Sequence, residues 1–160
     1  MGKSGCHIDR SVSLSIRLYR KHFKIIPKII WMFNRIVFAA DIPYQADIDE
    51  SVDWGHNGLG TVIHAGVSIG EKTTIMQGVT LGMNLGASRE YQGKVITSPQ
   101  IGKHCLIGAG AILIGPIVIG DNVIIGAGSV VTIDVPSGFV AVGSPARIIR
   151  EVDQKELDGY

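Results

Sequence analysis

The sequence has few cysteines, few aromatic residues and no long apolar run. Cysteine occurs twice in 160 residues, at Cys6 and Cys105, and neither stands in a spacing typical of metal or redox sites. Aromatic residues make up only 6%, whereas 21 residues are glycine, about twice the usual share. No apolar run reaches the roughly 18 residues of a membrane span, and no signal-peptide pattern opens the chain. The composition therefore predicts one cytoplasmic domain with unpaired thiols, rich in regular β-structure with tight turns.

Charge is unevenly distributed along the chain, although the net charge is only +1. Residues 1–40 contain eight Lys or Arg and one acid, Asp9, whereas residues 41–160 contain seven Lys or Arg and thirteen acids. This asymmetry divides the chain into a basic N-terminal segment and an acidic remainder. Because the larger part is acidic, we do not expect binding to nucleic acid.

Residues 14–38 have the apolar periodicity of an amphipathic helix. Apolar side chains recur at steps of three and four residues, and Pro27 is expected to bend or divide the helix. Between them stand basic and aromatic side chains: Arg17, Arg20, Lys21, Lys24, Lys28 and Arg35, and Tyr19, Phe23 and Trp31. Two interpretations are open. The segment lies on an anionic membrane surface, or it covers the end of the following domain or packs on a neighbouring subunit.

A six-residue repeat occupies most of the remaining chain. Aliphatic anchors recur in two long series after an early start at Ile42 and Ile48: Ile63, Ile69, Ile75 and Leu81, then Ile101, Ile107, Leu113, Ile119, Ile125 and Val131. The fifth position of each hexad is small or aliphatic and is expected to face inward as well. Neither a helix nor a flat strand has this period, whereas a coil with three sides of one hexad each has it. The repeat therefore predicts a parallel β-helix of triangular section, with coils stacked about 4.8 Å apart.

Two interruptions of the repeat mark places where the chain leaves the prism. Ile48 and Ile63 are 15 residues apart, three more than two hexads, and Leu81 and Ile101 are 20 apart, two more than three hexads. The second interruption is polar and contains several glycines, so we expect a projecting loop over residues 83–100. A loop on a rigid scaffold is a usual place for a substrate site, although a tolerated surface insertion would look the same.

Four stretches carry a resemblance to a known family: residues 77–82 (QGVTLG), 107–111 (IGAGA), 125–131 (IGAGSVV) and 142–149 (VGSPARII). Together they resemble the serine acetyltransferase branch of the hexapeptide-repeat acyltransferases. The resemblance implies an all-β fold, a left-handed parallel β-helix over residues 41–150, with an N-terminal helical segment (1–40) and a C-terminal tail (151–160). The short basic N-terminus is more like that of related polysaccharide O-acetyltransferases, such as those of colanic acid and capsule synthesis, because serine acetyltransferase has a much longer helical N-terminal domain.

The resemblance places a catalytic histidine at His56 and its carboxylate partner at Asp41. Both residue types are present, fifteen residues apart, a little less than one coil. A neutral imidazole can take the proton of a hydroxyl group, while a carboxylate holds its tautomer and stabilises the imidazolium. We therefore expect His56 to act as general base with Asp41 as its partner. The alternative is an ordinary surface histidine at a corner.

The acceptor side of the resemblance is incomplete. A second histidine of serine acetyltransferase aligns with Ser98, and the arginine before it aligns with Thr97. Loss of that arginine removes a ligand for a free carboxylate, although Arg89 in the loop could replace it. We therefore expect Arg89 and Ser98 to line the acceptor pocket. The final residues, Gly159–Tyr160, also differ from the Ile with which many serine acetyltransferases bind their partner enzyme.

The donor that the resemblance implies is acetyl-CoA, bound in a groove between neighbouring subunits of a homotrimer. The matching positions are Gly82 near the thioester, Ala109 and Ala127 along the pantetheine, and Arg147 near the phosphates. The alanines have a structural interpretation too, because hexad corners favour small residues. We expect no metal site, since the five histidines lack the spacing of ligands.

These observations predict an acetyl-CoA-dependent O-acetyltransferase. A saccharide of a surface polysaccharide is slightly favoured as acceptor, with residues 1–40 peripheral to the inner membrane surface. Two alternatives remain: a serine O-acetyltransferase of cysteine biosynthesis, and a trimeric β-helix scaffold without catalysis. Asp41 and His56 argue against the scaffold.

Overall fold

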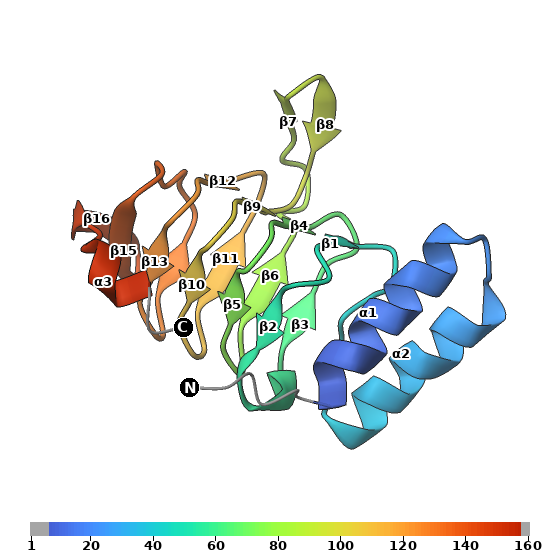
Figure 1. Cartoon of the computed structure of the whole chain (residues 1–160). Helices are drawn as coiled ribbons and strands as arrows, with labels where there is room; N and C mark the ends of the chain where they lie inside the picture. The colour runs from blue at the N-terminus through green and yellow to red at the C-terminus, as the bar shows by residue number, and fades with distance from the viewer. Residues whose placement is uncertain (1–6, 158–160) are drawn as a thin grey trace.

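The N-terminal segment is a hairpin of two helices. The computed structural model describes residues 7–157, so Cys6 and Gly159–Tyr160 lie outside the described residues. Helix α1 spans His7–Arg20 and helix α2 spans Ile25–Val37. The two helices pack against each other at one end of the molecule (Figure 1).

The expectation that Pro27 bends or divides a single helix is wrong. The break falls earlier, at residues 21–24, where His22 has a φ of 65°. Pro27 is the third residue of α2, in its first turn. Backbone N–H groups of a first turn have no acceptor within the helix, so a proline there removes no helical hydrogen bond.

Helix α1 covers the open end of the first β-coil. Its apolar face, formed by Ile8, Val12 and Ile16, is at most 2% exposed and belongs to the same core cluster as Trp54. Two of its arginines form exposed ion pairs with acids of that coil, Arg17 with Glu50 and Arg20 with Asp47. Helix α2 packs on α1 and leaves most of its apolar side chains exposed.

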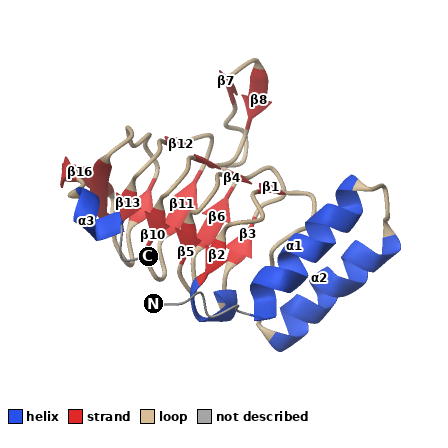
Figure 2. Cartoon of the chain, in the orientation of Figure 1, coloured by secondary structure: helices blue, strands red, loops and turns tan. Residues whose placement is uncertain are grey.

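The larger part of the chain is a β-helix with three sheets, whose strands run parallel except for the last strand of one sheet (Figures 1 and 2). The β1 sheet contains β1 (Asp47–Ile48), β4 (Ser68–Ile69), β9 (Gln100–Ile101) and β12 (Val118–Ile119). The β2 sheet contains β2 (Asp53–Trp54), β5 (Thr74–Ile75), β10 (Leu106–Ile107), β13 (Ile124–Ile125), β15 (Phe139–Gly143) and β16 (Ala146–Glu151). The β3 sheet contains β3 (Val62–Ile63), β6 (Thr80–Gly82), β11 (Ile112–Ile114) and β14 (Val130–Val131). Paired residues of uninterrupted coils, such as Leu106 and Ile124, are three hexads apart, which confirms the triangular coil.

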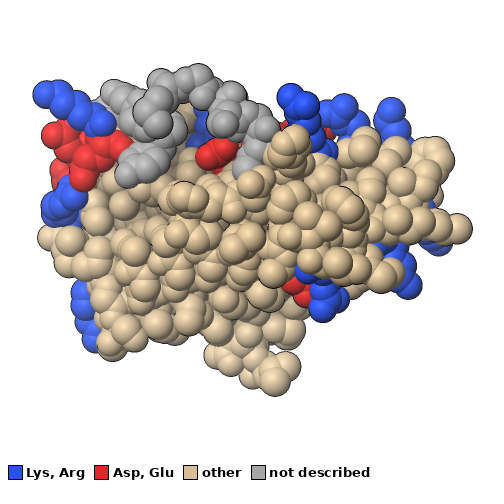
Figure 3. Space-filling view, turned by 90° about the horizontal axis from the view of Figure 1, so that it is seen from below, with Lys and Arg blue, Asp and Glu red and all other residues tan. Residues whose placement is uncertain are grey.

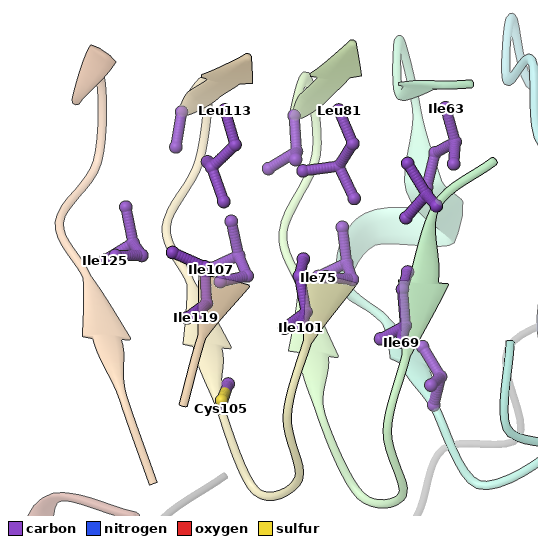
Figure 4. Close-up of a cluster of buried hydrophobic side chains, with 14 of the residues drawn as sticks. Ile63, Ile69, Ile75, Leu81, Ile101, Cys105, Ile107, Leu113, Ile119 and Ile125 are labelled. Carbon is purple, nitrogen blue, oxygen red and sulfur yellow. The ribbon is translucent and has the colours of Figure 1, made fainter. Parts of the chain in front are cut away.

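The hexad anchors fill the interior of the prism (Figure 4). All ten anchors of the two long series are at most 4% exposed, and the fifth positions from Val67 to Val135 are buried as well. Each buried side chain of this size stabilises the fold by roughly 1.5–3 kcal/mol. Cys105 is one of the fifth positions, and burial raises the pKa of its thiol to about 11.

The first interruption of the repeat forms a short turn. Nine residues separate Trp54 from Ile63, where one hexad would need six, and the three extra residues belong to the 3-10 turn η1 (Gly55–Gly58). The turn lies between the β2 sheet and the β3 sheet, within the interval from Ile48 to Ile63 where the repeat is interrupted.

The second interruption of the repeat contains a hairpin. Leu81 and Ile101 lie on adjacent sides of the prism, so one hexad would connect them, and their spacing of twenty exceeds that hexad by fourteen residues. The extra residues include an antiparallel hairpin of β7 (Arg89–Tyr91) and β8 (Lys94–Ile96), which projects from the prism (Figure 1).

An antiparallel pair, β15 and β16, ends the β-helix and is followed by α3 (Gln154–Leu157). Arg150 donates two hydrogen bonds of 2.7 Å to the carboxylate of Glu156, which ties α3 to β16.

Candidate active site

Two edges of the prism carry the candidate residues. The first edge joins the β2 sheet to the β3 sheet and consists of η1 and the corners 76–79, 108–111 and 126–129. Successive corners are linked by backbone hydrogen bonds of 2.8–2.9 Å: Gly78 to Leu59, Gly110 to Gln77, and Gly128 to Ala109. The second edge joins the β3 sheet to the β1 sheet and includes the projecting hairpin.

His56 lies on the first edge, within η1. Its φ is 52° and that of Asn57 is 58°, so two successive residues with side chains adopt left-handed conformations. Each costs roughly 1–2 kcal/mol, and such conformations cluster at functional sites. Gly58 of this turn is buried and packs against Ile8 of α1 and Trp54. A Cβ added to Gly58 would lie 3.4 Å from Ile8 and 3.7 Å from Trp54.

Asp41 lies at the start of the β3 sheet, close to the first edge. It pairs in parallel with Val62, six residues after His56. Its Oδ1 accepts a hydrogen bond of 2.8 Å from the indole Nε1 of Trp31, and its Oδ2 is 3.7 Å from Nε of Arg35. In the part of the chain that the structure describes, no hydrogen bond joins Asp41 to His56. The structure brings the two residues to the same end of the first edge, and their direct contact stays a prediction.

The residues predicted for the pantetheine and the phosphates follow the same edge. Ala109 and Ala127 occupy equivalent corners of adjacent coils. Arg147 is exposed and is paired with Val142 of β15, the strand that stacks on the coil of Ala127. His56, the two alanines and Arg147 therefore lie along one line, over five strand steps of roughly 4.8 Å each from β2 to β16.

Packing between coils explains only part of the small residues on this edge. A Cβ on Gly108 would lie 2.5 Å from the backbone nitrogen of Ala127, and one on Gly126 would lie 2.6 Å from Val142, so both positions need glycine. Ala127 itself is exposed, so packing within the chain does not require a small side chain there. A strip of small side chains along an edge allows an extended ligand to approach the backbone.

Gly82 and Ser98 lie on the second edge. Gly82 pairs with Ile114 of the next coil, and a Cβ there would make only an ordinary contact of 3.5 Å with it. Ser98 is fully buried, and its Oγ has no hydrogen-bond partner among residues 7–157. His64 on this edge is half-buried, and its Nδ1 accepts a hydrogen bond of 3.1 Å from the amide of Gly66.

Arg89 at the base of the hairpin is engaged in an ion pair. Its two terminal nitrogens donate to the two carboxylate oxygens of Asp134, at 2.8 and 2.9 Å. A substrate carboxylate would have to displace Asp134 before it could bind these nitrogens. The predicted role of Arg89 at the acceptor therefore stays a prediction that requires this pair to open.

Two residues near the site were not foreseen. Trp31 was assigned only to the amphipathic segment, and nothing in the sequence connects it with Asp41. Gln77 lies on the first edge one coil beyond His56, and its Oε1 is buried without a partner among the described side chains. Its position in the QGVTLG stretch was the only available indication. Residues 7–157 contain no group of three or more His, Cys, Asp or Glu that could hold a metal ion.

Comparisons with known proteins agree on one family. Residues 98–132 match the family model for the bacterial transferase hexapeptide (six repeats). Serine acetyltransferase of Helicobacter pylori is 35% identical over 145 residues, which cover 91% of this chain and 81% of that protein. Serine acetyltransferase of Synechococcus elongatus is 38% identical over 132 residues, 82% of this chain and 51% of that protein.

Solved structures agree with this result. Serine acetyltransferase of Neisseria gonorrhoeae in complex with serine matches with a TM-score of 0.75 and 34% identity, over 88% of this chain and 55% of that one. Serine acetyltransferase of Brucella abortus in complex with coenzyme A matches with a TM-score of 0.77 and 30% identity, over 90% and 55%. The chain thus spans about half the length of the Synechococcus relative and of both solved proteins. The fold and the first edge define a left-handed β-helix of the hexapeptide-repeat transferase class. Within that class, the chain belongs to the serine acetyltransferase family.

These relatives overturn the slight preference for a saccharide acceptor. Both curated relatives are named serine acetyltransferase, and they match 82% and 91% of the chain. The short N-terminal segment was one reason for that preference, yet the match covers 81% of the Helicobacter protein, so a long helical domain is not general in the family. A second reason was the replacement of the family's arginine and histidine by Thr97 and Ser98, and a third was the difference at Gly159–Tyr160. Because Ser98 is buried, its side chain is a poor guide to the acceptor bound at the surface.

Proposed function

We propose that this protein transfers the acetyl group of acetyl-CoA to the hydroxyl group of L-serine. Membership of the serine acetyltransferase family supports the reaction, and similar proteins have been solved with serine and with coenzyme A. The observation that carries the proposal in this chain is the line of His56, Ala109, Ala127 and Arg147 along one edge. The proposed general base, His56, lies at one end of that line, and Arg147, the residue proposed to bind the phosphates, lies at the other. Small side chains lie between them.

In the proposed reaction, His56 removes the serine hydroxyl proton as the oxygen attacks the thioester carbonyl. The new C–O bond forms, the C–S bond breaks, and the proton passes from the imidazolium to the leaving CoA thiolate, giving O-acetylserine and CoA. Asp41 holds the imidazole tautomer during transfer, and backbone amides stabilise the tetrahedral oxyanion. General-base assistance of this kind is worth about a hundred- to ten-thousandfold in rate.

We propose a homotrimer because the predicted site residues of one chain lie on two different edges. The first edge carries His56, Ala109, Ala127 and Arg147, and the second edge carries Gly82 and Arg89. The β3 sheet separates the two edges, so one copy cannot present both sets to the same substrate. Both sets can reach the same substrate where the first edge of one copy faces the second edge of a neighbouring copy. In a trimer with a threefold axis, each copy contributes its first edge to one such site and its second edge to the next.

The test is release of CoA from acetyl-CoA by the purified protein, with L-serine compared against a panel of sugars and glycans. We expect turnover with L-serine that His56→Ala reduces at least a hundredfold, while His7→Ala, a change at an exposed histidine of α1, leaves it intact. Turnover without dependence on His56 would refute the mechanism. Absence of turnover with L-serine would refute the substrate.

The exposed face of α2 supports a further part of the proposal, contact with an anionic membrane surface. Seven apolar side chains of α2 are 46–79% exposed: Ile25, Ile26, Ile29, Met32, Phe33, Ile36 and Val37. Lys21, Lys24 and Lys28 have no ion pair with any described residue, and the helical end carries Lys and Arg along its margins (Figure 3). Like charges oppose the packing of two such faces on each other, whereas lipid phosphates complement them. No helix within residues 7–157 is long and apolar enough to cross a bilayer.

Vesicle co-sedimentation tests this contact. We expect the protein to bind phosphatidylglycerol vesicles but not phosphatidylcholine vesicles, and Ile29→Asp to abolish binding. Leu85→Asp, at an 87% exposed site on the projecting loop, is the matched control and should bind like the unchanged protein. If Ile29→Asp instead lowers the molar mass in light scattering and no vesicles bind, the face packs on another copy and the membrane contact is refuted.

A further inference from the structure

Trp31 contacts the predicted catalytic carboxylate although it lies outside the β-helix. Its indole Nε1 donates a hydrogen bond of 2.8 Å to Oδ1 of Asp41. Only ten residues separate the two, and the intervening chain leaves α2 and enters the β3 sheet at Asp41. Helix α2 thus supplies a side chain to the end of the first edge.

Neighbouring side chains hold the indole ring in place. The guanidinium carbon of Arg35 is 4.9 Å from the ring centroid, and Tyr44 meets the ring edge to face at a centroid distance of 6.4 Å. The rings of Tyr44 and Tyr19 of α1 also meet edge to face, with their centroids 5.1 Å apart. Cation–π and edge-to-face contacts have preferred geometries, so they restrict the ring more than apolar packing alone would. The donor that reaches Asp41 is therefore fixed in direction.

The two oxygens of Asp41 have different surroundings. Oδ1 accepts the hydrogen bond from the indole, whereas among residues 7–157 the polar contact of Oδ2 is with Nε of Arg35 at 3.7 Å, which is too long for a hydrogen bond. A carboxylate held through one oxygen presents the other in a defined direction. This is the condition under which a carboxylate can fix the tautomer of a neighbouring imidazole.

We infer that Trp31 is a positioning residue for the proposed acetyl transfer, acting on His56 through Asp41. The inference rests on the proposed function, and it extends the site from the β-helix into α2. It assigns Trp31 a hydrogen-bonding role that the amphipathic pattern of its segment does not require. Substitution of the indole should therefore affect the chemical step more than substrate binding.

The experiment is a double-mutant cycle in steady-state kinetics. Trp31→Phe removes the N–H donor and keeps an aromatic ring, and we expect kcat to fall about tenfold while the KM values for serine and acetyl-CoA change less than twofold. Tyr44→Phe is the matched control, because it changes the same aromatic cluster without touching Asp41, and it should leave kcat within twofold. In an Asp41→Asn background, Trp31→Phe should have almost no further effect.

Two outcomes would overturn the inference. Equal losses from Trp31→Phe and Tyr44→Phe would show that the cluster only packs. A full tenfold loss from Trp31→Phe in the Asp41→Asn background would show that the indole does not act through Asp41.

Failure of the proposed function is recognised separately. If the unchanged protein does not turn over L-serine, the substrate assignment fails, and the cycle is run with the acceptor that the panel identifies. The indole N–H signal in a ¹H–¹⁵N spectrum, assigned with Trp31→Phe, reports on the contact without any acceptor. We expect this proton to exchange faster with water in Asp41→Ala than in Tyr44→Phe, and equal exchange in the two variants would refute the contact on which the inference depends.

Discussion

Arg89 and Asp134 join the projecting hairpin to the far coils of the β-helix. The guanidinium donates to both carboxylate oxygens, at 2.8 and 2.9 Å, and Oδ1 of Asp134 also accepts a hydrogen bond of 2.8 Å from the amide of Val118. One carboxylate therefore holds the base of the hairpin and the start of β12 together. The two side chains are 37% and 49% exposed, so their pairing adds about 1 kcal/mol or less to global stability.

Breaking this pair should loosen the hairpin without unfolding the protein. We expect Asp134→Asn and Arg89→Gln each to speed hydrogen exchange of the amides in residues 83–100, with only a small change in Tm. The double variant should exchange no faster than either single variant, because the same pair is lost in all three. Additive effects would show that the residues anchor the hairpin independently.

Kinetics distinguish anchoring by Arg89 from its predicted role at the acceptor. If Arg89 leaves Asp134 to bind the serine carboxylate, Arg89→Gln should raise the KM for serine at least tenfold. Asp134→Asn should then leave that KM unchanged or lower it, because the guanidinium is released. Equal changes of the KM for serine in the two variants would show that Arg89 only anchors the hairpin.

Core and surface positions of one hexad should differ sharply in their contribution to stability. Ile107 is fully buried in the column of anchors, whereas Ile112 on the next side of the same coil is 36% exposed. We expect Ile107→Ala to lower the free energy of unfolding by about 2–5 kcal/mol and Ile112→Ala by about 1 kcal/mol or less. Urea unfolding at one fixed protein concentration measures both, and similar losses would contradict the hexad assignment.

The sequence predicted features that arise from one repeating geometry and missed those that depend on single long-range contacts. Ile107 and Leu113 could be placed in the core because a prism with six-residue sides imposes that period on every coil. The contact of Trp31 with Asp41 joins a helix to a sheet that share no period, so no pattern predicted it. Arg89 is similar, because its partner Asp134 lies 45 residues away and follows a different coil.

Ala127 allows a test of the donor groove that leaves the chemistry intact. Its side chain is exposed on the first edge, so Ala127→Trp should fold normally and obstruct a ligand lying along that edge. We expect the KM for acetyl-CoA to rise more than tenfold, with a smaller effect on the KM for serine. Lys103→Trp places the same bulk on the edge between the β1 and β2 sheets and should change neither value. Equal effects of the two variants on the KM for acetyl-CoA would show that acetyl-CoA does not bind along the first edge.

The ion pair at the C-terminal end predicts a defined dependence of stability on pH. The hydrogen bonds from Arg150, with a smaller contribution from the amide of Asp153, lower the pKa of Glu156 from 4.5 to about 2. Because the folded-state pKa is below the unfolded value, the charged carboxylate stabilises the fold above pH 4.5, and this contribution is lost as the pH falls towards 2. Glu156→Gln should therefore lower Tm at pH 7, and the difference from the unchanged protein should shrink between pH 4.5 and 2. Glu151→Gln, which removes an acid from β16 that forms no ion pair with any described residue, is the control. A Tm difference that stays constant across this window would show that the charge of Glu156 does not hold α3 in place.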